Sequence, residues 1–277
     1  WRQPIREQWR DMEVLSAPPP SSGGFALVQL LKLRDFADSH FRGLSHNEPK
    51  YVHLLAELEK RVFADRAEYL GDPDYVVNPI GQLIADDYIA RRAREVNPDD
   101  VSQLEAVQPG LESPETTHYS IVDQWGNAVS NTYTLNWNYG CGVVVEGAGF
   151  LLNNEMDDFS VKPGVPNIFG VVGSTANEIQ PGKRMLSSMS PTFVEGPDRV
   201  VILGTPGGSR IITMVLLGIL DAIEGAPVAD IVSGTRFLTR QGGSVRGSGT
   251  WILSNASLEL LDDFTTDATI QLTGVTV

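Results

Sequence analysis

Thr116 opens the stretch Thr116-Thr117-His118-Tyr119-Ser120, in which hydroxyl side chains and a histidine lie close together in the sequence. A threonine hydroxyl is a poor nucleophile unless a base lies within hydrogen-bonding reach. His118 follows Thr116 by two residues on a predicted strand, so the two side chains are expected to point to the same side. No Gly-x-Ser-x-Gly elbow is present and no aspartate has a recognisable pairing with His118. The pattern therefore gives little support to a serine hydrolase.

A second way to activate Thr116 is to use its own α-amine as the base, which requires a chain break between Glu115 and Thr116. The segment 99–115 is acidic, contains prolines and has little periodicity, so it is predicted to be an exposed linker. A strand is predicted to begin directly after it. Taken alone, a Thr-Thr pair at the start of a strand is ordinary β-propensity, so the local stretch does not identify a nucleophile.

The elements that would position these residues change in kind at Thr116. Before it, apolar residues recur every three to four positions, which predicts helices; after it, alternation predicts strands. The predicted helices span 25–36, 50–70, 81–94 and 209–223. The predicted strands span 117–123, 128–135, 142–146, 149–152 and 199–203, the first two as a hairpin. A layered α+β fold fits this order.

The composition excludes one class of partner. The chain has 277 residues, 21 Lys+Arg and 35 Asp+Glu, and a formal net charge of −14. Nucleic-acid binding would need a basic stripe, and the sequence has none. Its single cysteine, Cys141, is too few for a zinc site and is expected to be a buried structural thiol. No apolar run is long enough to cross a membrane.

Five segments after Glu115 resemble, in order and at similar spacing, the small-subunit motifs of γ-glutamyltransferases. These segments are 116–123 (TTHYSIVD), 132–136 (TYTLN), 151–160 (LLNNEMDDFS), 186–191 (LSSMSP) and 205–210 (TPGGSR). Two upstream segments, 18–24 (PPPSSGG) and 65–73 (DRAEYLGDP), resemble the late part of the family's large subunit. Together the resemblance covers about residues 12 to 236.

The resemblance implies a four-layer αββα Ntn-hydrolase sandwich in which Thr116 begins a central strand. Residues 1–115 would be the end of a large-subunit-like region, and residues 116–277 a small-subunit-like catalytic region freed by self-cleavage at Glu115–Thr116. Both regions would build one domain and stay together as a heterodimer. The implied reaction is γ-glutamyl transfer or hydrolysis on glutathione-like amides, with no metal or organic cofactor.

The resemblance also implies a role for each matching residue. Thr116 would be the nucleophile, Thr134 would hold its amine, and Gly207 and Gly208 would offer amide N–H groups to the oxyanion. The substrate's α-amine would be bound by Asn136, Glu155 and Asp158. Its α-carboxylate would be bound by Ser187 and Ser188. Without the resemblance, Thr134 would be a cross-strand hydroxyl, Asp158 a solvated turn residue and the Gly-Gly pair a plain turn.

Several features depart from the family pattern. Phe169, in the lid-like stretch 163–183, stands where many bacterial relatives have tyrosine. The family's arginine for the α-carboxylate would lie in a part of the large subunit that this sequence does not include. The chain begins without Met, so it is expected to be the inside of a longer protein, and a periplasmic or extracellular location is expected from resemblance only. Downstream of Arg236 the family's closing pattern is not found.

Three alternatives stay open at this stage. One is the same fold with another amide substrate, as in cephalosporin (glutaryl) acylases or poly-γ-glutamate depolymerases. Because glutaryl side chains have no α-amine, Asp158 favours a γ-glutamyl donor. The second is a catalytically silent γ-glutamyl-binding remnant. The third is the serine hydrolase based on His118.

Overall fold

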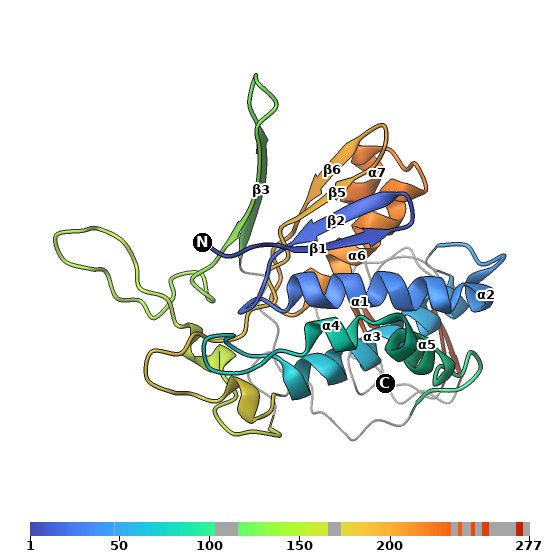
Figure 1. The fold of residues 1–277 in the computed structure, drawn as a ribbon, viewed down its shortest axis with the longest axis horizontal. Helices are drawn as coiled ribbons and strands as arrows, with labels where there is room; N and C mark the ends of the chain where they lie inside the picture. The colour runs from blue at the N-terminus through green and yellow to red at the C-terminus, as the bar shows by residue number, and fades with distance from the viewer. Residues whose placement is uncertain are drawn as a thin grey trace.

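A four-stranded antiparallel sheet forms one layer of the molecule (Figure 1). Its order is β1 (Ile5–Trp9), β2 (Met12–Ser16), β5 (Thr192–Glu195) and β6 (Val200–Leu203). In this computed structural model, the described residues are 1–46, 48–102, 116–165, 173–233 and the short strands 238–239, 245–246, 251–254 and 270–273. Because β2 pairs with β5, the sheet joins strands from both sides of Thr116.

The sequence patterns did not predict β1, β2 or β5. These strands have only four or five residues each. In β1 the sequence is IREQW, whose mostly polar side chains carry little apolar alternation. Short strands of this kind are stabilised by their neighbours in the sheet rather than by local preference.

Helices pack against this sheet. Helix α1 (Gly23–Phe36) contacts β1 and β2, and it also packs against α3 (Pro49–Tyr69) and α6 (Arg210–Ile223). Ten residues of α1 are buried, because neighbours cover it nearly all round. The short helices in this layer are α2 (Asp38–Phe41), α4 (Ile80–Leu83), α5 (Asp86–Arg94) and α7 (Val228–Ser233). The predicted helices over 25–36, 50–70 and 209–223 are confirmed.

The helix predicted over 81–94 is two helices. Ala85 has ψ of 142°, an extended conformation that separates α4 from α5. The strands predicted over 142–146 and 149–152 are wrong, since only an isolated bridge joins Val144 to Leu151. Glycines with positive φ occur along this loop, at 140, 142, 147 and 149, and they favour turns over regular strands. Cys141 in the same loop is exposed, so the prediction of a buried thiol is also wrong.

The predicted hairpin is confirmed as β3 (Thr117–Val122) and β4 (Ala128–Tyr133). It extends away from the four-stranded sheet (Figure 1). Among the described residues its sheet has two strands, so Thr116 does not precede a central strand as expected. A two-stranded hairpin buries little apolar surface on its own, and most residues of β3 are exposed.

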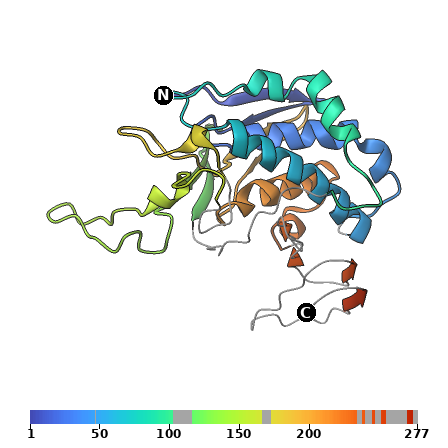
Figure 2. The same cartoon turned by 90° about the horizontal axis from the view of Figure 1, so that it is seen from below.

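Beyond Ser233 the structure describes four short strands. They are β7 (Leu238–Thr239), β8 (Val245–Arg246), β9 (Trp251–Ser254) and β10 (Ile270–Thr273), and β9 pairs with β10 in parallel. In Figure 2 these strands lie below the helices, and β9 contacts α3. Within the described part of the chain, no helix is long and apolar enough to cross a membrane.

Candidate active site

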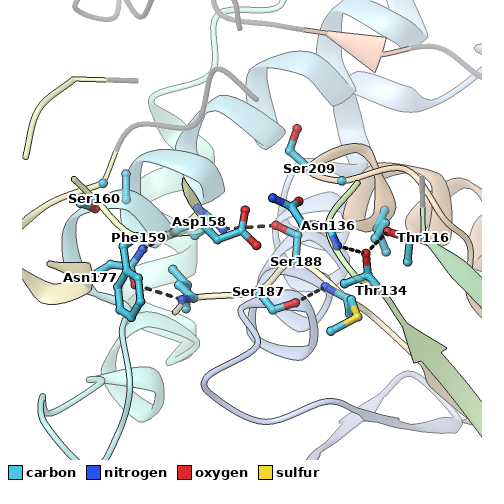
Figure 3. A pocket seen from close by; sticks show the side chains of 17 residues that line it. Thr116, Thr134, Asn136, Asp158, Phe159, Ser160, Asn177, Ser187, Ser188 and Ser209 are labelled. Carbon is cyan, nitrogen blue, oxygen red and sulfur yellow. Dashed lines mark hydrogen bonds between the residues drawn. The ribbon is translucent and has the colours of Figure 1, made fainter. Parts of the chain in front are cut away.

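A pocket forms where the end of α3, the residues around the hairpin, the 3-10 helix η1 (Glu155–Asp158) and the start of α6 converge (Figure 3). Most of the residues singled out from the sequence line it: Thr116, Thr134, Asn136, Asp158, Ser187, Ser188 and Gly208. The other two, Glu155 and Gly207, are next to lining segments without lining the pocket themselves. In Figure 3, Thr116 and Thr134 lie at one end and Asp158 at the other.

At the Thr116 end, two hydroxyls meet. Thr116 Oγ1 donates to Thr134 Oγ1 at 3.3 Å, and Thr134 Oγ1 also accepts a bond from Asn136 N at 2.8 Å. Thr134 directly follows β4, so the hairpin brings it opposite Thr116 although the two are 18 residues apart. Thr116 has φ of 150°, a value that a β-branched residue rarely adopts.

Gly207 and Gly208 connect β6 to α6. Their φ values of 127° and 56° are positive, so a side chain at either position would strain the backbone. Their carbonyls accept bonds from Arg210 N and Ile211 N, whereas neither amide N–H donates to another described residue. Amide donors just before a helix can bind a negative charge. This turn therefore offers unused donors to the pocket, from Gly208 in particular.

At the other end, a carboxyl group enters the pocket from η1. Burial, together with the nearby charge of Glu155, raises the pKa of Asp158 to about 7, although the positive charge of Arg66 opposes the rise. Burial also raises the pKa of Glu155. Asn136 is buried, and its Nδ2 donates to Asn154 O at 3.3 Å. A ligand ammonium at this end would gain an ionised Asp158 as its partner.

The serine pair is held by the segment 18–24. Ser187 N donates to Pro20 O at 2.8 Å, and Ser22 N donates to Ser187 O at 2.8 Å. Gly23 allows this close approach, because a Cβ added there would lie 2.2 Å from Ser190 Oγ. The two segments resembling different subunits of the family are thus in direct contact.

Two pocket residues were missed by sequence reasoning. Arg66 is 4% exposed and bonds Ser22 and Ser188. Asn177 is 5% exposed; its Nδ2 donates to Asp158 O at 2.8 Å and its Oδ1 accepts from Leu186 N at 2.9 Å. Arg66 lies within the quoted segment 65–73, which was a usable signal. Asn177 lies within the lid-like stretch 163–183, but that resemblance gave it no role.

His118 does not line this pocket. Its Nδ1 is 2.8 Å from Thr132 Oγ1 and its Nε2 is 3.1 Å from Ser120 Oγ. The ring packs so closely on Gly204 that a Cβ there would lie 2.2 Å from it. This arrangement gives no support to His118 as the base for Thr116. Phe169 and the middle of the predicted lid lie outside the described residues.

Comparisons with known proteins identify the family. A family model described as gamma-glutamyltranspeptidase matches residues 1–247. The chain is 60% identical over 216 residues to a glutathione hydrolase proenzyme of Pseudomonas aeruginosa, covering 78% of this chain and 39% of that protein. It is 45% identical over 242 residues to the Escherichia coli protein of the same name, covering 85% and 41%. The chain therefore spans about two fifths of the length of these relatives.

The fold has a counterpart among solved structures. A cephalosporin acylase from Bacillus halodurans superposes with a TM-score of 0.69 at 23% identity, covering 90% of this chain and 42% of that one. The expected α+β class and Ntn-hydrolase fold are thereby confirmed. Of that fold, the described residues build the four-stranded sheet with its helices and the separate hairpin. The chain belongs to the gamma-glutamyltranspeptidase family.

Proposed function

We propose that this chain is the catalytic part of a γ-glutamyl transferase or hydrolase acting on glutathione-like amides. One observation carries the proposal: the Thr116 hydroxyl lies at one end of a pocket whose other end combines a carboxylate, Asp158, with the Ser187 and Ser188 hydroxyls. A γ-glutamyl group needs this arrangement, because its α-ammonium and α-carboxylate lie at one end and its reacting carbonyl lies at the other.

Maturation is proposed to begin at the peptide bond before Thr116. Its hydroxyl attacks the carbonyl carbon of Glu115, the C–N bond breaks, and water hydrolyses the resulting ester. The products are a carboxylate on Glu115 and a free α-amine on Thr116. The φ of 150° at Thr116 supports this step, because residues held in sparsely populated conformations are found at functional sites.

In the proposed turnover, the freed α-amine of Thr116 takes the proton of its own hydroxyl. The hydroxyl oxygen bonds to the γ-carbonyl carbon, and the amide N–H groups of Gly207 and Gly208 stabilise the oxyanion. The leaving amine departs with the proton, which leaves an ester on Thr116. Water then yields glutamate, or an acceptor amine yields a new γ-glutamyl amide. Thr134 would hold the amine of Thr116 in place.

Substrate recognition is assigned to the far end of the pocket. Asp158, with Asn136 and Glu155 beside it, would bind the α-ammonium, and the two serine hydroxyls would bind the α-carboxylate. A glutaryl amide has no ammonium to offer Asp158, so the cephalosporin acylase alternative is less well supported. Poly-γ-glutamate chains carry the same end group, and they remain an alternative donor.

The two cleavage products are proposed to stay together, the first ending at residue 115 and the second beginning at 116. The pairing of β2 with β5 and the packing of α1 on α6 support this, because each contact joins one fragment to the other. The family resemblance also leads us to propose a periplasmic or extracellular location, which cell fractionation would test.

Mass spectrometry of the full-length protein tests the function. We expect two fragments separating between Glu115 and Thr116, and a mass increase on Thr116 after reaction with a γ-glutamyl affinity label. Replacing Thr116→Ala should abolish both cleavage and turnover. Binding of glutamate without any labelled Thr116 would instead support the catalytically silent alternative, and activity surviving in the Thr116→Ala variant would refute the nucleophile.

A further inference from the structure

Arg66 is a buried cation in the pocket wall to which the proposed mechanism gives no role. It lies near the end of α3 and is 4% exposed. Its Nε donates to Ser22 Oγ at 2.8 Å, and its Nη2 donates to Ser188 Oγ at 3.2 Å. Burial of a guanidinium costs free energy unless its N–H groups and its charge find partners. Here the partners are the buried Ser22 and the pocket residue Ser188.

The bond from Arg66 determines what the Ser188 hydroxyl can do. Arginine has donors and no acceptor, and a serine hydroxyl has one hydrogen and two lone pairs. Arg66 therefore occupies a lone pair of Ser188 Oγ and leaves the hydrogen of that hydroxyl available. A hydroxyl oriented in this way is suited to donate to a ligand carboxylate, and such charge-assisted bonds are stronger than neutral ones.

Arg66 also acts on Ser187 through Ser22. Because Ser22 Oγ accepts from Arg66, its own hydrogen is directed to Ser187 O, at 2.7 Å. Ser187 O also accepts a hydrogen bond from Ser22 N, so the backbone of Ser187 is held by two hydrogen bonds. The Ser187 hydroxyl accepts from Met189 N at 3.0 Å, which again leaves its hydrogen for a ligand.

The charge of Arg66 also acts on Asp158, the carboxyl group proposed to bind the α-ammonium. The charged groups that face Asp158 are Arg66 from α3 and Glu155 and Asp157 from its own 3-10 helix. Arg66 is the cation in this set, and it lowers the pKa of Asp158 while burial and both acidic neighbours raise it. After cleavage, the α-amine of Thr116 would be a further titrating group at the far end.

We infer that Arg66 is a positioning residue for both charged groups on the α-carbon of the γ-glutamyl substrate. It orients the two serine hydroxyls as donors to the α-carboxylate, and its positive charge favours the ionised form of Asp158 that the α-ammonium needs. The inference rests on the proposed function, since it assigns work to Arg66 within the same pocket. Arg66 belongs to the fragment that precedes the cleavage site. That fragment would therefore help the downstream fragment to recognise the substrate.

Three competitors of γ-glutamyl-p-nitroanilide hydrolysis, measured on full-length protein, separate binding of the α-amine from binding of the α-carboxylate. L-Glutamate carries both α-groups, glutarate lacks the α-amine, and 4-aminobutyrate lacks the α-carboxylate. Arg66→Met should raise the inhibition constants of all three competitors, each by about tenfold or more. For the γ-glutamyl-p-nitroanilide substrate, KM should change more than kcat. The substitution should also move the acidic limb of kcat/KM to higher pH, because Asp158 loses its nearby cation.

Arg66→Lys provides a sharper outcome. Lysine keeps the charge but cannot make both forked bonds, so glutarate binding should stay weak while 4-aminobutyrate binding and the acidic limb return towards wild type. Ser22→Ala should weaken glutarate and spare 4-aminobutyrate. If Arg66→Met fails to fold, these two variants still decide the matter.

Arg61→Met is the matched control. Arg61 is also buried on α3, with 5% exposure, but it pairs with Glu57 and does not line the pocket. The Arg61→Met variant should have a lower melting temperature. Its inhibition constants and the acidic limb of its kcat/KM profile should be unchanged. Unchanged constants and an unchanged limb in Arg66→Met would overturn the inference. An inactive, unlabelled wild-type protein would instead contradict the proposed function.

Discussion

The two ends of the pocket are held in different ways. The recognition end is built from buried groups of several segments: Ser22, Arg66, Asn177 and Ser190 are all at most 8% exposed. The nucleophile end depends on a two-stranded hairpin with exposed apolar residues along it: Tyr119, Ile121, Val122, Trp125, Val129 and Tyr133. One side-chain bond, from Ser130 Oγ to Leu203 O at 3.3 Å, links the hairpin to the four-stranded sheet.

Binding and chemistry therefore depend on different parts of the fold. At the recognition end, buried Ser22 and Arg66 hold the serine pair, and buried Asn177 holds the backbone of Asp158, so much of the site is organised before a ligand arrives. At the nucleophile end, the position of Thr116 relative to Gly208 depends on a hairpin with little buried surface. Substitutions at the two ends should therefore change different quantities.

The largest effect is expected at the nucleophile end. Gly208→Ala should lower kcat by about 100-fold or more, since it disturbs an oxyanion donor and adds a side chain at φ of 56°. The inhibition constant of L-glutamate should change much less, because that ligand forms no tetrahedral oxyanion. Steady-state kinetics and competition on the full-length protein would measure both. A loss confined to binding would contradict the separation of the two ends.

Asp158→Asn should produce the converse result. Removal of the charge that binds the α-ammonium should raise KM for γ-glutamyl-p-nitroanilide by about 10- to 100-fold, with a smaller change in kcat. Inhibition by glutarate, which has no amine, should be nearly unchanged and serves as the internal control. Equal losses with glutarate and L-glutamate would show that Asp158 does not bind the amine.

The pH dependence should sharpen the same contrast. The pKa of Asp158 is raised to about 7, so below this pH the carboxyl becomes protonated and loses its attraction for an ammonium. We expect kcat/KM for γ-glutamyl-p-nitroanilide to fall about tenfold per pH unit well below pH 7, and kcat at saturation to fall less. In Asp158→Asn this limb should disappear. Its persistence would assign it to another group, such as the Thr116 amine.

The smallest effects concern stability. Asn177→Ala removes two bonds, to Asp158 O and from Leu186 N, and leaves both partners without them in a buried region. Its free energy of unfolding should fall by about 2–3 kcal/mol. Ser130→Ala removes the side-chain hydrogen bond from the hairpin to Leu203 O and should cost about 0.5–1 kcal/mol. Denaturant titration would compare the two, and a larger loss in Ser130→Ala would reverse the proposed ranking.

Local sequence patterns predicted the regular elements where a segment carries its own signal. The apolar periodicity of 50–70 and 209–223 predicted α3 and α6, and the alternation after Thr116 predicted the hairpin. The patterns failed for β1 and β5, which are short and depend on neighbouring strands. They also failed over 142–152, where apolar residues suggested strands but positive-φ glycines form turns. The same loop leaves Cys141 exposed, since no element covers it.

The sequence motifs were enough to identify the family and most of the proposed site residues. A motif is recognised by residue types at set spacings, and these survive in a linear string. Only the tertiary structure decided that Arg66 and Asn177 belong to the same site. The role of Arg66 comes from packing between segments more than 100 residues apart, since the end of α3 meets Ser188. Asn177 joins Asp158 to Leu186, and this contact also depends on how the chain folds back on itself. Burial and hydrogen-bond direction arise from that packing, so no local pattern could indicate them.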